Sequence, residues 1–244
     1  MGSAAFAEDT FSISSPSLLM SQKEQSVVLH LSRADGSPLR LSDLVTAHQS
    51  KIHLLVVDDS MTDYQHIHPA EGTAPGDYIF SFTPKTAHDY TVWADILPVS
   101  APHEYLKAAL KGKDPCKTAC ISKALSLKGA SQGLTGALSF DRRFLKAKEA
   151  AMGRLIIKDE SGQPVKDLEP VMGAFAHIVG FYAGKTGVVH LHPMGDEPVS
   201  DQARGGPSLV FHLEPDRPGI IKLFAQVRRG GKDIFIPFTL RITS

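Results

Sequence analysis

The 244-residue chain lacks any excess of charge, because its 26 Lys and Arg residues are matched by 26 Asp and Glu residues. A neutral balance offers no electrostatic attraction for nucleic acid or for an anionic membrane surface. Long apolar runs are also missing, since no segment approaches the roughly 18 apolar residues that a membrane-spanning helix needs. The sequence therefore predicts neither a nucleic-acid partner nor a membrane span.

Local signatures of catalysis are missing as well. The chain contains no Gly-rich phosphate loop, no Gly-x-Ser-x-Gly elbow and no evident pair of catalytic carboxylates. Ser, His and Asp residues are present, but no local pattern arranges them as a triad. These absences leave enzymatic activity open and favour a binding role.

Cysteine is scarce, with only Cys116 and Cys120, both in the segment DPCKTAC. In an exported protein such a pair most often forms a local disulfide, and the alternative is a thiolate pair for a soft metal or for redox exchange. The residues AFA at 5–7 resemble the small-x-small end of a secretory signal peptide, although no apolar h-region precedes them. We therefore expect a periplasmic or secreted protein.

The most distinctive feature of the sequence is a histidine motif that occurs twice. His-x-His-Pro occurs at residues 66–69 and again at 190–193. A third histidine stands thirteen residues ahead of each motif, at His53 and His177. Agreement at this offset, together with similar apolar runs on either side, indicates two copies of one unit.

Each copy is built from short segments rich in β-branched and aromatic residues, with turn residues between them. We predict a mostly β fold, with two tandem immunoglobulin-like or cupredoxin-like β-sandwich domains related by internal duplication. The predicted domains span residues 8–100 and 133–244. A connecting insertion at 101–132 carries the cysteine pair, and its segment HEYLKAALKG at 103–112 has a short helical pattern.

The histidine pairs point to a metal site because residues i and i+2 of a strand project from the same face. His66 and His68 should therefore project together, as should His190 and His192. The proline after each pair is expected to end ladder pairing and to place the motif at a loop or a sheet edge. If the preceding strand is a hairpin neighbour, its leading histidine completes a group of three.

Further donors surround each group of three. His48 lies five residues before His53, and Met172 occupies the corresponding position in the second copy. The candidate metal ligands are His48, His53, His66, His68, Met172, His177, His190, His192, Met194 and His212.

These imidazole and thioether donors limit which metals the site is expected to bind. Imidazole suits copper, zinc, nickel and iron, and thioether sulfur favours Cu(I). Copper is the first expectation because Cu(II) is at the top of the divalent affinity series, and zinc is the alternative because three histidines with an open position also describe zinc sites. A blue-copper site is disfavoured, because it needs a cysteine thiolate and neither cysteine is near a histidine group in sequence.

The segment VTAHQSKIHLLVVDDSMTDYQHIHP, followed by GDYIFSF and YTVWADILP, resembles the His-rich β-sandwich domain of bacterial periplasmic proteins that handle heavy metals. The second copy, with MGAFAHIVGFYAGKTGVVHLHP and FHLEPDRPGIIKLFAQV, is similar to a related half of the same group. This group is commonly associated with copper resistance and with metal-transporting ATPases. The resemblance implies metal binding in the periplasm, and it implies no particular reaction.

The leading hypothesis is an exported protein that binds copper for sequestration, delivery or resistance, with a metal transporter or acceptor protein as a possible partner. A copper-dependent oxidoreductase or another metalloenzyme is an alternative, as is a zinc-binding protein. The third hypothesis is a structural or adhesive module in which the histidines are incidental.

Overall fold

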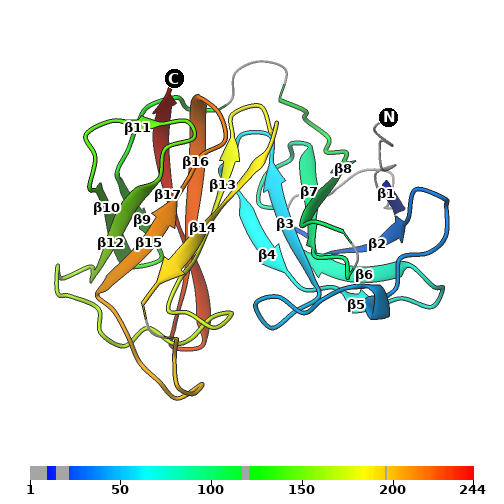
Figure 1. Ribbon diagram of the computed structural model, residues 1–244, viewed down its shortest axis with the longest axis horizontal. Coiled ribbons are helices and arrows are strands. Elements are labelled where there is room, and N and C mark those ends of the chain that lie inside the picture. The colour runs from blue at the N-terminus through cyan, green and yellow to red at the C-terminus, as the bar shows by residue number, and fades with distance from the viewer. Residues whose placement is uncertain (1–9, 15–21, 100, 117–120, 196) are drawn as a thin grey trace, which may run out of the picture. The chain divides into compact units, whose positions relative to one another are not determined.

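The computed structural model describes residues 10–14, 22–99, 101–116, 121–195 and 197–244. The chain divides into two compact units, Met1–Ile121 and Ser122–Ser244 (Figure 1). In the described part of the chain the regular structure is β-strand, apart from one 3-10 turn, η1 (Leu41–Asp43). The mostly β prediction is confirmed.

The first unit is a sandwich of two four-stranded antiparallel sheets, with strand orders β1-β2-β6-β5 and β4-β3-β7-β8. Its strands are β1 (Thr10–Ser14), β2 (Gln25–Ser32), β3 (Ile52–Asp58), β4 (Tyr64–Ile67), β5 (Ala70–Glu71), β6 (Asp77–Phe82), β7 (Tyr90–Ile96) and β8 (Glu104–Leu110). Alternate residues of the central strands fill the space between the sheets, such as Leu29 on β2 and Leu54 on β3, both fully buried. Each such side chain stabilises the fold by about 1.5–3 kcal/mol relative to an exposed one.

The second unit contains one continuous ladder of nine strands, in the order β11-β17-β16-β13-β14-β15-β12-β10-β9. Strand β14 pairs first with β13, through Leu191, and from His192 onward with β15, so it carries the ladder from one layer of the sandwich to the other. The strands are β9 (Lys128–Ser131), β10 (Leu134–Phe140), β11 (Leu145–Lys146), β12 (Ala151–Asp159), β13 (His177–Tyr182), β14 (Val188–Met194), β15 (Ser208–Leu213), β16 (Gly219–Arg229) and β17 (Lys232–Thr243).

Strand pairing reveals the duplication directly. In the first unit Leu55 of β3 lies opposite His66 of β4, and in the second Val179 of β13 lies opposite His190 of β14. Val179 lies 124 positions after Leu55, and His190 lies 124 positions after His66. The predicted pair of tandem sandwiches related by duplication is therefore confirmed at the level of individual register positions.

The prediction of a helix in HEYLKAALKG is wrong, because Glu104–Leu110 forms strand β8 and pairs with β7 along its whole length. Cross-strand pairing outweighed the high helical propensity of Ala, Lys and Leu. The first compact unit accordingly extends through this segment. Cys116 is disulfide-bonded, while Cys120 and the expected signal remnant at 5–7 lie outside the described residues.

The prediction that each motif proline ends ladder pairing holds in part. Strand β4 ends at Ile67, before Pro69, and the chain pairs again as β5 in the other sheet. In the second unit β14 continues through Pro193, which lies opposite Phe211 of β15. In both units pairing with the first partner strand ends before the proline, because the chain crosses there to the opposite sheet.

Candidate metal centre

The β3–β4 hairpin brings the histidines of the first unit together. Along β3, residues Ile52, Leu54 and Val56 face the core of the sandwich, so His53 points to the opposite face. His66 on β4 lies across from Leu55, two residues further along the same face. His68 follows directly after β4.

The imidazole nitrogens of these three residues converge. The Nδ1 atom of His53 lies 3.1 Å from Nε2 of His66 and 3.0 Å from Nε2 of His68. One ligand atom from each residue lies within 4.8 Å of the other two. His53 is buried, His66 is half-buried and His68 is exposed, so the group leads from the interior to solvent.

A backbone carbonyl fixes the protonation of the central ring. The Nε2 atom of His53 lies 2.9 Å from the carbonyl oxygen of Ala47. Because a carbonyl oxygen only accepts hydrogen bonds, Nε2 carries the proton and the lone pair is on Nδ1, which faces His66 and His68. Histidine ligands in metal sites are typically held by this kind of outer hydrogen bond. Sequence reasoning missed Ala47, because a carbonyl acceptor has no signature in a side-chain pattern.

The spacing of the nitrogens fits a common ion. Imidazole nitrogens bound to one zinc-sized metal at about 2.0–2.1 Å are separated by about 3 Å in tetrahedral or square arrangements. Two of the three nitrogen separations in this group have that value. The group therefore has the donor type and spacing of a three-histidine metal site, with His68 on the solvent side.

His48 lies beside this group without joining it closely. It occupies a tight turn closed by paired hydrogen bonds of 2.9 and 3.0 Å between Ala47 and Ser50, and its φ of 46° is left-handed. Its ring centroid is 6.4 Å from that of His53, and the side chain is exposed. A role of His48 as a fourth ligand stays a prediction.

The second unit repeats the arrangement with a different ring orientation. His177 at the start of β13 is buried, and its Nε2 lies 2.7 Å from Nε2 of His190 on β14. In the first unit the leading histidine uses Nδ1 for the same contact. The backbone of His192 lies opposite His212 of β15, and the side chain of His192 is outside the described part of the structure.

The two methionines proposed as thioether ligands, Met172 and Met194, each have a counterpart at the equivalent position of the first unit. Met172 is in the same kind of turn as His48, with a φ of 52° and paired hydrogen bonds of 2.7 and 3.2 Å between Val171 and Ala174. Its side chain is buried. Met194, exposed at the end of β14, corresponds to Ala70 of the first unit. The second unit thus offers thioether sulfur at two positions where the first offers imidazole or a methyl group.

The remaining histidines described have ordinary polar partners. Nδ1 of His30 forms a hydrogen bond of 2.6 Å with the carboxylate of Asp77, and Nδ1 of His88 lies 2.8 Å from the carbonyl oxygen of Asp114. His103 forms a short contact with the buried carboxylate of Asp95, and this hydrogen bond raises the pKa of His103. These contacts give His30, His88 and His103 structural roles.

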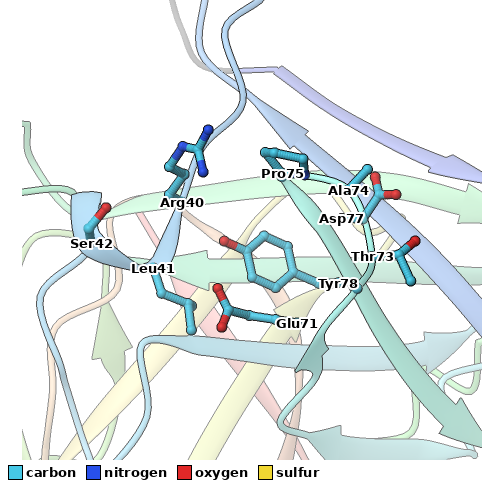
Figure 2. Close-up of a pocket in the computed structure, with 11 residues that line it drawn as sticks. Arg40, Leu41, Ser42, Glu71, Thr73, Ala74, Pro75, Asp77 and Tyr78 are labelled. Carbon is cyan, nitrogen blue, oxygen red and sulfur yellow. The ribbon is translucent and has the colours of Figure 1, made fainter.

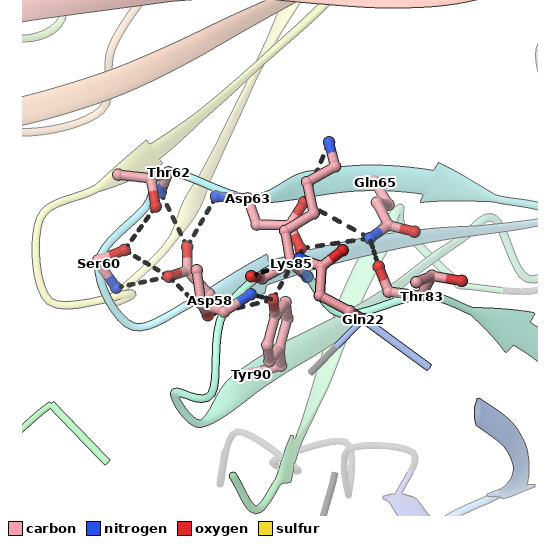
Figure 3. A network of polar contacts seen from close by, with 10 residues as sticks. Gln22, Asp58, Ser60, Thr62, Asp63, Gln65, Thr83, Lys85 and Tyr90 are labelled. Carbon is pink, nitrogen blue, oxygen red and sulfur yellow. Dashed lines mark hydrogen bonds and ion pairs between the residues drawn. The ribbon is translucent and has the colours of Figure 1, made fainter. Parts of the chain in front are cut away.

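A buried polar network holds the other end of the hairpin (Figure 3). The carboxylate of Asp58 accepts hydrogen bonds from the backbone N–H groups of Thr62 and Asp63, at 2.8 and 2.9 Å. Asp63 in turn accepts from the Tyr90 hydroxyl at 2.7 Å. Asp58 and Asp63 are almost fully buried, and each is satisfied by several donors. The network stabilises the turn that sets the register of His53 against His66.

A hollow of about 410 Å³ lies elsewhere in the first unit, between η1 and the β5–β6 turn (Figure 2). Tyr78 lies beneath it, and its hydroxyl donates a hydrogen bond of 2.9 Å to the carbonyl of Leu39. Burial raises the pKa of Tyr78 to about 12, so the phenol stays neutral at physiological pH. This tyrosine is a structural support and has the wrong protonation state for a general base.

The sequence matches the family described as "Domain of unknown function (DUF8832)" over residues 5–104 and 130–244. No curated protein matches the chain. In the described part of the chain, no helix is both long enough and apolar enough to cross a membrane.

Three similar solved structures have low sequence identity. The Escherichia coli adhesin FdeC is 15% identical, with a TM-score of 0.30, over 98% of this chain and 65% of its own. The Yersinia pseudotuberculosis adhesin InvE is 11% identical, with a TM-score of 0.29, over 99% and 62%. The α2-macroglobulin from Escherichia coli is 11% identical, with a TM-score of 0.28, over 99% and 16%. The chain thus spans less than two thirds of each of these proteins.

Proposed function

The chain belongs to the DUF8832 family, and from the geometry of its histidines we propose that it binds copper for sequestration, delivery or resistance. The ligands in the first unit are His53, His66 and His68. In the second unit His177 and His190 form the corresponding core, with His192, Met172, Met194 and His212 as further candidates.

One observation carries this proposal. The lone pair of His53 Nδ1 faces two other imidazole nitrogens at 3.0 and 3.1 Å, while its Nε2–H is held by the Ala47 carbonyl. With its Nε2–H given to Ala47, the ring of His53 offers only the Nδ1 lone pair, and an N–H of either His66 or His68 can satisfy that lone pair with one hydrogen bond. A cation held between the rings would engage the lone pairs of all three at once. A bound metal ion supplies that cation, and the outer hydrogen bond orients the ring for it.

Copper is preferred over zinc because of the donors around the two groups. Cu(II) binds imidazole more tightly than the other divalent first-row ions, and thioether sulfur favours Cu(I). The second unit, with Met172 and Met194, is the softer donor set, and the first unit has imidazole alone. Zinc remains the alternative metal, since three histidines with an open position suit it as well.

We place this function in the periplasm or outside the cell. A disulfide at Cys116 supports this location, because structural disulfides persist mainly in oxidising compartments. The exposed side of the site, at His68, would allow a metal transporter or an acceptor protein to approach the bound ion.

Equilibrium dialysis against Cu(II), Zn(II) and, under reductant, Cu(I) tests the proposal. The wild-type chain should bind at least one equivalent of copper, and the first-unit variant with all three histidines replaced by alanine should lose one equivalent. The matched control removes the same number of histidines outside the groups, at His30, His88 and His103. Equal copper stoichiometry in the two triple variants and the wild type would contradict the proposal.

A further inference from the structure

A second candidate binding site lies in the second unit, away from the histidines. Its cavity of about 570 Å³ is formed by the segment before β9, the loop between β10 and β11, and the end of β17. Leu125, Leu127 and Phe144 line it and are 52%, 46% and 63% exposed. A gathering of large exposed apolar side chains is a feature of binding surfaces.

The segments that line this cavity are held together by backbone hydrogen bonds. Ser126, between the two leucines, exchanges backbone hydrogen bonds of 2.9 and 3.0 Å with Thr239 of β17. The carbonyl of Leu127 accepts from the N–H of Leu138, and the carbonyl of Thr243 accepts from the N–H of Ala147. These backbone groups are therefore satisfied, and an extended peptide could not add to them as a further strand.

Positive charge surrounds the apolar lining. Arg142 is neutralised by Glu149 at 2.8 Å. Arg143 lies over the ring of Phe144, 5.3 Å from its centroid, and Arg241 has no ion pair within the described part of the chain. Among the residues that the structure describes, neither Arg143 nor Arg241 has a carboxylate partner, and both line the cavity together with the apolar side chains.

We propose that this cavity binds a single-chain anionic amphiphile, with the hydrocarbon chain against Leu127 and Phe144 and the anionic group at Arg143 and Arg241. The volume is in the range typical of small-molecule sites, about 300–1,000 Å³. A hydrocarbon chain needs no backbone partners, which suits walls whose hydrogen bonds are already made. The guanidinium groups supply charge-assisted hydrogen bonds for a carboxylate.

Titration calorimetry of the full chain with dodecanoate, below its micelle concentration and with EDTA present, tests this proposal independently of any metal. We expect saturable binding of one dodecanoate per chain and weaker binding of dodecyltrimethylammonium, which has the same chain length and the opposite charge. Leu127→Asp should weaken dodecanoate binding by about tenfold. Val199→Asp is the matched control, because Val199 is 95% exposed and lies outside the cavity.

A second variant separates the charged group from the apolar lining. The double replacement Arg143→Gln and Arg241→Gln should weaken dodecanoate by about fivefold and leave the cationic probe no weaker. Thermal unfolding of each variant without ligand checks that the fold is kept, as expected for exposed positions. Equal binding by the Leu127 and Val199 variants would overturn the proposal, as would binding to anionic vesicles alone. A change of oligomeric state caused by Leu127→Asp would also overturn it, since the cavity would then be a self-association surface.

Discussion

Replacement of His53 by alanine is the sharpest perturbation of the proposed metal site, because its Nδ1 atom is next to both other ligand nitrogens. Loss of a group that only orients a ligand lowers metal affinity by about 10–100-fold, and loss of the ligand itself should lower it by at least about 100-fold. At a Cu(II) concentration of about 100 times the wild-type Kd, binding raises the free energy of unfolding of the wild type by about 2.7 kcal/mol. The same concentration only equals the Kd of the variant, so its gain falls to about 0.4 kcal/mol.

Thermal unfolding with and without Cu(II) measures this difference. With a shift of about 2–4 °C per kcal/mol, the Tm of the wild type should rise by about 5–11 °C and that of the variant by about 1–2 °C. Comparison of each protein with its own metal-free Tm removes the cost of the cavity that alanine leaves. His88→Ala, whose imidazole contacts the Asp114 carbonyl outside the group, should behave as the wild type. A full Tm shift in the His53 variant would refute the assignment of its Nδ1 as a ligand.

Three further predictions follow from the described contacts. Met172→Ala should lower the Cu(I) affinity of the second unit by about tenfold in competition with a Cu(I) chelator. The control Met61→Ala, at a buried methionine of the first unit, should not. Equal losses would remove Met172 as a ligand. Because its contact with Asp95 raises the pKa of His103, this contact stabilises the fold below about pH 6.5 and is lost as pH rises through the folded-state pKa. The stability gap between wild type and His103→Gln in urea unfolding should therefore close with rising pH, and a constant gap would contradict the assignment. Asp58→Asn should cost about 1–3 kcal/mol in urea unfolding, because an amide NH₂ replaces one acceptor oxygen at a fully buried position. A neutral substitution would show that the network does not stabilise the hairpin.

Much of the fold was predictable because the repeat is encoded in local patterns. The i, i+2 spacing within each His-x-His pair indicated which residues share a face, and the common offset from His53 to His66 and from His177 to His190 indicated which strands pair. The strand at Glu104–Leu110 was missed because its composition of Lys, Ala and Leu favours a helix, and only pairing with β7 decides for a strand. Such non-local contacts leave no trace in a short window of sequence.

The sequence predicted which residues form the candidate site, but it could not predict which ring nitrogen each histidine presents. Spacing placed His53, His66 and His68 together, but the choice of Nδ1 on His53 depends on the Ala47 carbonyl, which belongs to a turn with a left-handed residue at His48. The same turn in the second unit precedes His177, whose Nε2 makes the corresponding contact. Ring orientation is set by tertiary packing, so two nearly identical motifs can present different nitrogens.

The difference between the units has a chemical consequence for the proposed function. An imidazole group with an exposed edge suits Cu(II), and a donor set that includes thioether sulfur suits Cu(I). A protein with both kinds of site could accept copper in either oxidation state.

The most direct test of the central claim is the electron paramagnetic resonance spectrum of the full chain loaded with one equivalent of Cu(II). Convergence of His53, His66 and His68 on one ion predicts a single copper species with nitrogen couplings from several imidazoles, and loss of that species when the three are replaced by alanine. A spectrum of weakly bound, oxygen-coordinated copper, or one that is the same in the alanine variant, would contradict the account.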